Sequence, residues 1–221
     1  MMETKINVLS FGMVNAYLLQ GEKNILVDSG PARKYKKLEE QVNACGIGMK
    51  DIDLIIITHA HSDHYGNVLE IKKGFDTPVA IHESSFTENT EVKQVEAIPN
   101  GFLPSIMIKL FGNMKVDSFI PDIAINSDFD LNDYGVNGEV IHIPGHTKDS
   151  IGILIDGHRM ITGDTIGSNR KKKPVEAMFL NDREQYKNSI EKILGYNPTE
   201  IYCSHGSVLT GNAIEKIREW I

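Results

Sequence analysis

The sequence predicts an α/β fold, and two observations support this prediction. Over the first third of the chain, short apolar runs alternate with segments whose apolar residues recur every three to four positions. After residue 118 a second series of short apolar runs begins, and an amphipathic helix is predicted at Asp182–Leu194. Strands that alternate with helices form sheets covered by helices.

The elements of the first part follow from composition and periodicity. A helix is predicted at Lys34–Ala44, where Gly46 provides a stop, and a second helix is predicted in the residues after His64, where Gly74 ends it. The predicted strands of this part are Lys5–Phe11, Val14–Gln20, Asn24–Val27, Asp53–Ile57 and Pro78–His82.

Strands return in the second part of the chain. Asp156-Gly157 predicts a two-residue hairpin turn, and a terminal helix is predicted at Ala213–Ile221. The predicted strands are Phe119–Ile125, Phe129–Leu131, Glu139–Ile143, Ile151–Ile155, Arg159–Thr162 and Ile201–Cys203.

Residues 84–118 interrupt the alternation. Ser84–Ala97 is polar and predicted to be helical, and Pro104 is placed to begin another helix. A dense apolar group follows, made of Phe102, Leu103, Ile106, Met107, Ile108, Leu110, Phe111 and Met114. No repeat or low-complexity linker sets this region apart. We therefore interpret residues 1–221 as a single domain with a mainly helical insertion at about 84–118 near the active site. The insertion is either a lid, whose apolar group lines an acyl pocket, or extra core.

Composition and charge narrow the class of protein. The chain is 41% hydrophobic and 24% charged, as in ordinary globular proteins, and has no apolar run long enough to span a membrane. Because the first residues lack the apolar core of a signal peptide and only Cys45 and Cys203 occur, we expect a cytoplasmic protein without disulfides. The net charge of −7 disfavours a nucleic-acid partner. The expected partner is a small-molecule substrate. The oligomeric state is left open, with a homodimer as one option.

A histidine-rich run dominates the candidate chemistry. Thr58–Asn67 follows the apolar run Leu54–Ile57, and it places three histidines and an aspartate within six residues: His59, His61, Asp63 and His64. Imidazole and carboxylate groups gathered at the end of a buried strand indicate a metal site that needs further ligands.

Three other strand ends supply ligand-type residues. Each lies beside a glycine that allows a sharp turn: His146 in Pro144–Thr147, Asp164 in Thr162–Thr165, and His205 in Ser204–Gly206. Residues at strand ends converge from distant parts of an α/β chain.

These segments, together with the early aspartate turn Val27–Gly30, resemble the metallo-β-lactamase superfamily, and the resemblance spans residues 27–206. It implies a four-layer αβ/βα sandwich in which two mixed sheets face each other, helices cover the outer faces, and the metal site lies along one edge.

The resemblance also implies the role of each residue. His59, His61 and His146 would bind the first metal ion, Asp63, His64 and His205 the second, and Asp164 would bridge both. The donors suit two Zn²⁺ ions, and iron or manganese would also fit. Two such ions, about 3.5–4 Å apart, hold a shared hydroxide that acts as the nucleophile. Asp63 would be the catalytic residue that orients this hydroxide and shuttles a proton, and Asp28 would orient the ligand loops through hydrogen bonds.

The remaining candidates have plainer interpretations. We expect His158 to be solvated, His82 to be structural, and His142 to pack in the core or contact a ligand. Cys203 is expected to be a buried thiol. The basic run Arg170–Lys173 is either a solvated loop or an attractor of anionic substrates at the mouth of the site.

The leading functional prediction is a metal-dependent hydrolase that cleaves an ester, thioester or lactone. The histidine run with its Gly66-Asn67 ending is similar to the glyoxalase II-type branch, but only 16 residues follow His205, so the helical domain that binds glutathione is not expected. One alternative is an iron-dependent oxidoreductase resembling persulfide dioxygenases. Another is a phosphodiesterase or nuclease of the same fold, which the acidic charge disfavours.

Overall fold

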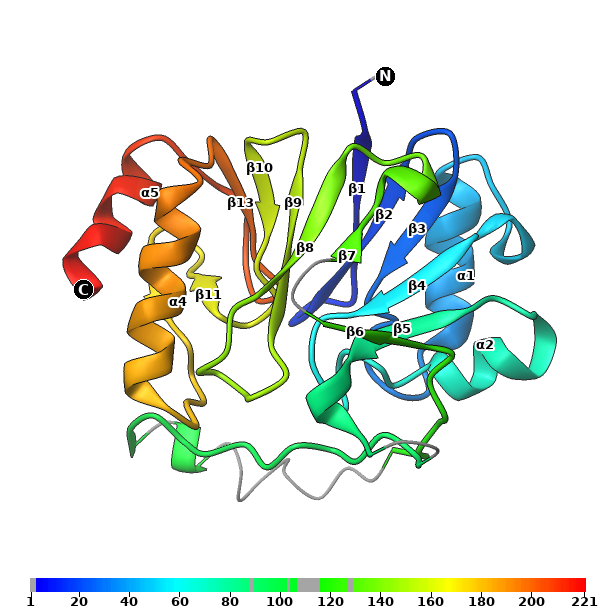
Figure 1. Ribbon diagram of the computed structural model, residues 1–221, viewed down its shortest axis with the longest axis horizontal. Coiled ribbons are helices and arrows are strands. Elements are labelled where there is room, and N and C mark those ends of the chain that lie inside the picture. Colours follow the sequence, from blue (N-terminus) through cyan, green and yellow to red (C-terminus); the bar gives the residue numbers. More distant parts are fainter. Residues whose placement is uncertain (1–2, 88–89, 103, 107–115, 127–128) are drawn as a thin grey trace.

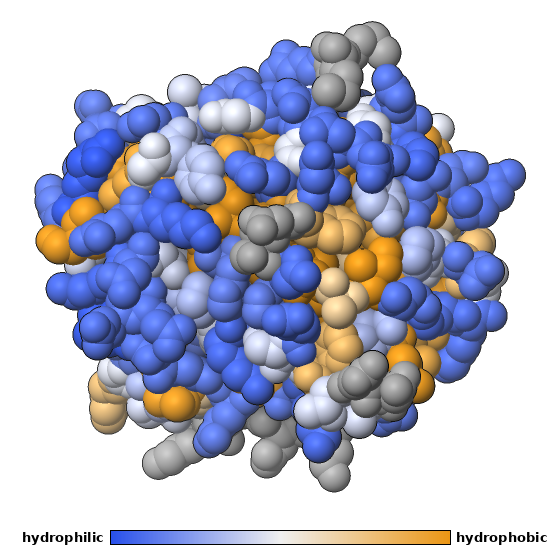
Figure 2. Space-filling model, in the orientation of Figure 1, coloured by the Kyte–Doolittle hydropathy of each residue, from blue (hydrophilic) through white to orange (hydrophobic). Residues whose placement is uncertain are grey.

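The four-layer arrangement predicted for this chain is confirmed by a computed structural model. The structure describes residues 3–87, 90–102, 104–106, 116–126 and 129–221. Two sheets face each other in the middle of the molecule, helices α1 and α2 cover the outer face of one sheet, and helices α4 and α5 cover the outer face of the other (Figure 1). The face drawn in Figure 2 is largely hydrophilic, in keeping with the net charge of −7.

The first sheet contains six strands among the described residues, and its spatial order follows the chain. The strands are β1 (Lys5–Ser10), β2 (Asn15–Gln20), β3 (Asn24–Val27), β4 (Leu54–Ile57), β5 (Val79–His82) and β6 (Ile123–Ile125). β1, β2 and β3 pair antiparallel, whereas β3 to β6 pair parallel. Helices α1 (Tyr35–Ala44) and α2 (Val68–Gly74) connect the parallel strands, with a 3₁₀ turn η1 (Met49–Asp51) between α1 and β4.

The second sheet is mostly antiparallel; β10 and β13 form a parallel pair within it. Its order is β14 (Leu209–Thr210), β13 (Glu200–Tyr202), β10 (Arg159–Ile161), β9 (Ile151–Ile155), β8 (Gly138–His142) and β7 (Phe129–Asp130). The remaining elements are α4 (Arg183–Gly195), α5 (Asn212–Glu215), the hairpin β11 (Ile166–Ser168) with β12 (Pro174–Glu176), and the 3₁₀ turns η2 (Glu83–Ser85), η3 (Asn132–Tyr134) and η4 (Lys216–Trp220).

The alternation of side chains along strand β4 explains the layering. Leu54 and Ile56 belong to the core between the two sheets, whereas Ile55 and Ile57 belong to the core beneath α1 and α2. All four side chains are fully buried, because a central parallel strand is covered on both faces. A third core fills the space between the second sheet and α4. The strand is thus held rigidly up to the residue before Thr58.

The prediction of a helix at Ser84–Ala97 is wrong for the described residues. After η2, residues 90–97 have no regular secondary structure, and their backbone groups bond to distant segments instead of to one another: Val92 N donates to Phe119 O and Val95 N to Ala60 O. Residues 104–106 are helical, as Pro104 predicts. Of the apolar group, Leu103, Met107, Ile108, Leu110, Phe111 and Met114 lie outside the described residues.

Smaller differences concern the ends of elements. The strand predicted at Phe119–Ile125 is reduced to β6, and the terminal helix is one short α turn followed by η4. None of the helices formed by the described residues is both long and apolar enough to cross a lipid bilayer.

Candidate metal centre

Four loops that each follow a strand meet at one edge of the sandwich. They carry the seven side chains singled out in the sequence, and the structure places these in two groups. We call His59, His61 and His146 with Asp164 the first cluster, and Asp63, His64 and His205 the second cluster. The structure therefore brings all seven together, while their role as ligands stays a prediction.

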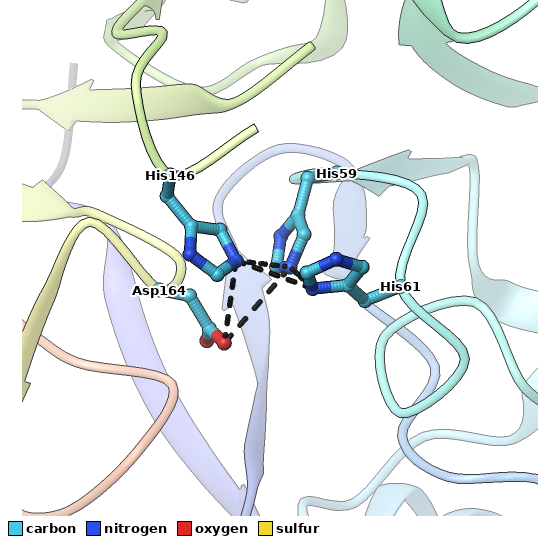
Figure 3. Close-up of side chains that lie close together, drawn as sticks. All are labelled: His59, His61, His146 and Asp164. Atoms are coloured by element: carbon cyan, nitrogen blue, oxygen red, sulfur yellow. Dashed lines mark hydrogen bonds and ion pairs between the residues drawn. The ribbon is translucent and has the colours of Figure 1, made fainter. Parts of the chain in front are cut away.

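The first cluster is formed by three imidazole rings that face a common point (Figure 3). His59 Nε2 lies 3.0 Å from His61 Nδ1 and 3.2 Å from His146 Nε2. His61 Nδ1 and His146 Nε2 are also 3.2 Å apart, and Asp164 Oδ2 is 3.7 Å from His146 Nε2. Three ring nitrogens at these distances cannot all be paired by N–H···N hydrogen bonds. Nitrogen lone pairs therefore face each other unless a cation lies between them.

The second cluster surrounds the same aspartate from the other side. Asp164 Oδ2 lies 3.1 Å from His205 Nε2, and Asp164 Oδ1 lies 3.3 Å from His64 Nε2. Asp63 completes the group: its Oδ2 lies 3.5 Å from His205 Nε2, and its Oδ1 lies 3.7 Å from His64 Nε2. The side chains of Asp63 and His205 are 35% and 32% exposed, whereas that of His64 is fully buried. The second cluster therefore faces solvent and the first does not.

Backbone carbonyl oxygens behind the rings of His146 and His205 determine which ring nitrogen faces the site. His146 Nδ1 lies 2.7 Å from Phe179 O, and His205 Nδ1 lies 2.7 Å from Met13 O. Because a carbonyl oxygen only accepts, each Nδ1 must donate, so Nε2 is the nitrogen of each ring that faces the site and that could bind a metal ion once it carries no proton. No sequence signal could have identified either partner, since any residue type provides a carbonyl oxygen.

Asp28 holds the start of the histidine run through three hydrogen bonds. Its Oδ1 accepts from Thr58 N at 2.8 Å, and its Oδ2 accepts from Thr58 Oγ1 at 2.9 Å and His64 Nδ1 at 2.8 Å. Because the Thr58 hydroxyl donates to Asp28, it is free to accept from His59 Nδ1, 3.1 Å away. One buried carboxylate thus orients a ring in each cluster, in line with the orienting role expected for Asp28.

Glycines beside the candidate ligands meet a steric requirement. A side chain at Gly145, which has a φ of +133°, would clash with the backbone of Tyr186 in α4. A side chain at Gly66 would clash with the backbone of Pro31 and Ala32, next to the Asp28 turn. Gly145 therefore lets the His146 loop approach α4, and Gly66 lets the histidine run approach Asp28.

Burial and charge act in opposite directions in the two clusters. Burial and the neighbouring His64 imidazole lower the pKa of His59 well below its usual value, and burial lowers the pKa of His61 to about 3. Burial also lowers the pKa of His146. The three imidazoles of the first cluster are therefore neutral at pH 7.

In the second cluster carboxylates outweigh burial. Burial alone would lower the pKa of His64 and of His205. The charge of Asp164, together with Asp28 and Asp63 at His64 and with Asp63 at His205, holds both pKa values well above the usual value. Conversely, burial would raise the pKa of Asp164, but His205 and His64 keep it well below its usual range, and the pKa of Asp63 is lowered in the same way. Both carboxylates are therefore ionised.

Two buried polar atoms indicate that the donor set fits a cation. His64 Nε2 and Asp164 Oδ1 face each other at 3.3 Å, yet neither has a hydrogen-bond partner among the described residues. Buried polar atoms are rarely left without partners. A divalent ion would satisfy them, and five imidazoles with two carboxylates suit a metal that accepts N and O donors.

The other residues singled out in the sequence lie outside both clusters. The rings of His82 and His142 stack with centroids 4.0 Å apart, and His158 Nδ1 bonds to Asp156 O. Cys203 is buried, and burial raises the pKa of its thiol to about 12. Arg170–Lys173 forms the exposed tip of the β11–β12 hairpin, whose Ser168 N donates to His205 O.

Comparison with known proteins extends over almost the whole chain. The sequence model of the metallo-beta-lactamase superfamily matches residues 9–205. A probable metallo-hydrolase of Methanocaldococcus jannaschii is 36% identical over 204 residues, which cover 88% of this chain and 88% of that protein. The hydroxyacylglutathione hydrolase GloC of Haemophilus influenzae is 26% identical over 213 residues, covering 93% of this chain and 91% of that protein.

Solved structures show the same fold. A metallo-beta-lactamase family protein of Thermus thermophilus superposes with a TM-score of 0.71 at 18% identity, covering 99% of this chain and 78% of that chain. An archaeal metallo-beta-lactamase superfamily protein of Sulfolobus tokodaii gives a TM-score of 0.69 at 18% identity, covering 97% and 85%. Sequence and fold agree, and the chain belongs to the metallo-β-lactamase superfamily.

Proposed function

We propose that this protein is a hydrolase that uses two zinc ions to cleave an ester, thioester or lactone. The observation that carries the proposal is the position of Asp164, whose Oδ2 lies 3.7 Å from His146 Nε2 and 3.1 Å from His205 Nε2. One carboxylate between two groups of imidazoles is the arrangement that a pair of bridged ions requires. In this proposal the first cluster binds one ion and the second cluster the other.

The ions would supply Lewis acidity, lowering the pKa of water and polarising the substrate carbonyl oxygen. The chain itself supplies orientation and proton transfer. Asp63 is ionised and one third exposed, so its carboxylate accepts a hydrogen bond from an incoming water and takes up its proton. Cys203 does not compete as a nucleophile, because its buried thiol stays protonated at neutral pH.

Apolar side chains on both sides of the site favour an acyl compound over a phosphodiester. Met13, whose carbonyl holds His205, is 73% exposed. The Phe179 ring lies 6.5 Å from the His61 ring. Met178, which precedes Phe179, and Ile98, whose carbonyl accepts from Leu180 N, are also exposed. Exposed apolar residues around a polar site suit an apolar substrate group. The similarity to a hydroxyacylglutathione hydrolase supports a thioester within this class.

The proposal is tested with a substrate panel on zinc-replete protein, comprising lactones, acyl thioesters, activated esters, β-lactams and phosphodiesters. We expect turnover of one of the first three classes, its loss after chelation, and its return with zinc. Metal analysis of protein purified without added metal is the second arm. Stoichiometric iron with oxygen consumption would establish the oxidoreductase alternative, and turnover of phosphodiesters alone would establish the phosphodiesterase.

A further inference from the structure

A buried carboxylate without a role in the proposed mechanism lies behind the first cluster. Asp149 follows His146 by three residues and is fully buried. Its Oδ2 accepts hydrogen bonds from Ala60 N at 2.8 Å and from Ser85 Oγ at 2.6 Å. Its Oδ1 is buried without a hydrogen-bond partner among the described residues. Burying a carboxylate is costly unless its bonds compensate, so these two bonds must hold firmly.

The orientation of the peptide groups beside Ala60 affects the geometry of the first cluster. Ala60 lies between His59 and His61, so the peptide planes on its two sides set the directions of both rings. Asp149 holds the N–H of Ala60, and Val95 N donates to the carbonyl of Ala60 at 3.0 Å. Rotation of either peptide would separate ring nitrogens that now lie 3.0 Å apart.

The Asp149 carboxylate also connects two of the loops that carry the first cluster. Asp149 belongs to the loop that carries His146, whereas Ala60 belongs to the loop that follows β4. A backbone bond from Ile151 N to Thr58 O, at 2.9 Å, also connects the two segments. Asp149 also contacts Ser85, which follows β5, and Ile98 O accepts from Leu180 N beside the carbonyl that holds His146.

We propose that Asp149 is a positioning residue for the first cluster. Its hydrogen bond to Ala60 N holds His59 and His61 at the separation from His146 at which the three ring nitrogens share one metal ion. The inference rests on the metal binding proposed above and adds a residue that touches neither metal nor substrate. Its effect is exerted on metal affinity and does not depend on the identity of the substrate.

The test compares Asp149→Ala, Asp149→Asn and Ser85→Ala in the 221-residue chain, with zinc affinity measured by competition with a chromophoric chelator. Asp149→Ala is expected to weaken the binding of one zinc ion by about 10–100-fold, the usual effect of losing a group that orients ligands. Asp149→Asn keeps a carbonyl oxygen for Ala60 N and should restore most of the affinity. Ser85→Ala leaves the Ala60 bond intact and should change zinc affinity much less than Asp149→Ala.

The matched control is Asp122→Ala. Asp122 Oδ2 also accepts from one backbone N–H, that of Val79, and from one side chain, that of Lys72, at a place where neither cluster is touched. Its removal should lower thermal stability and leave zinc affinity unchanged. Equal zinc affinity in Asp149→Ala and wild type, equal weakening by Asp122→Ala, or no rescue by Asp149→Asn would each overturn the inference. A wild-type protein that binds no zinc would instead refute the proposed function.

Discussion

The two clusters differ in exposure and in the groups that surround them. In the first, His59, His61 and His146 are almost completely buried, and imidazoles face imidazoles. In the second, His64 and His205 face the carboxylates of Asp63 and Asp164, and Asp63 and His205 reach solvent. If zinc binds as proposed, we expect the first cluster to retain its ion and the second cluster to meet water and substrate.

Protonation follows the same division. Without metal, the first cluster presents neutral rings whose lone pairs already converge, because burial lowers their pKa. The rings of His64 and His205 are instead held protonated by carboxylates, which raise their pKa. An ion entering the second cluster must displace these protons, whereas an ion entering the first displaces none. We therefore expect the first ion to bind more tightly than the second.

The largest expected effect comes from removing the residue that both clusters share. Asp164→Ala should reduce the zinc content below two per chain and lower hydrolysis of activated esters or thioesters by at least about 10³-fold, since both ions lose a ligand. Zinc analysis and initial rates measure the two effects. Asp130→Ala, at an exposed aspartate of β7, serves as the control. Full activity with two bound ions would refute the bridging role of Asp164.

The difference between the clusters is tested directly by His146→Ala and His205→Ala. After dialysis against a weak chelator, His205→Ala should retain about one zinc ion per chain, because the buried first cluster is intact. His146→Ala should retain less, because the tighter position has lost one of its three rings. Both variants should lose most of their activity. The reverse order of zinc retention would contradict the proposed division.

The sequence predicted the candidate site where the identity of the side chain itself determines the chemistry. The seven candidate ligands could be predicted because each is a histidine or aspartate at the end of an apolar strand, next to a turn. Phe179 and Met13 could not, since they act through carbonyl oxygens, and Asp149 had no partner that sequence alone could identify.

The same limit applies to the fold. Strands such as β4 and β9 are continuous apolar runs, and they were predicted to within a residue or two. The β11–β12 hairpin was missed because its tip is a run of basic residues and its strands are only three residues long. Residues 90–97 were predicted to be helical from local composition, yet the backbone N–H groups of Val92 and Val95 donate to carbonyl oxygens of remote segments.

A smaller effect is expected at Asp28, which supports the second cluster through His64. Asp28 has a φ of +60°, a conformation that asparagine tolerates, so Asp28→Asn should preserve the turn. The variant loses the charge that orients His64 Nδ1, and the affinity for one zinc ion should fall by about 10–100-fold while the other stays bound. Chelator competition resolves the two affinities. An equal loss at both positions would show that Asp28 supports the whole run, through Thr58.

The smallest expected effect concerns His82, where the effect of burial on a histidine pKa can be measured apart from metal binding. His82 resembles the first cluster in that burial and a neighbouring imidazole, that of His142, lower its pKa to about 4, but it lies outside both clusters. The pKa of His82 in the unfolded chain is about 6.5. Between pH 6.5 and 4 the unfolded chain therefore takes up a proton that the folded chain does not, so the free energy of unfolding falls as the pH falls through this range. The loss amounts to at most about 3 kcal/mol, and to less where water screens the ring.

His82→Asn keeps an acceptor for Ser84 N. In urea unfolding of metal-free protein, the free energy of unfolding of this variant should decline less steeply between pH 7 and 4.5 than that of the wild type. An unchanged slope would mean that His82 is not held neutral by the fold, and would weaken the same argument for the first cluster.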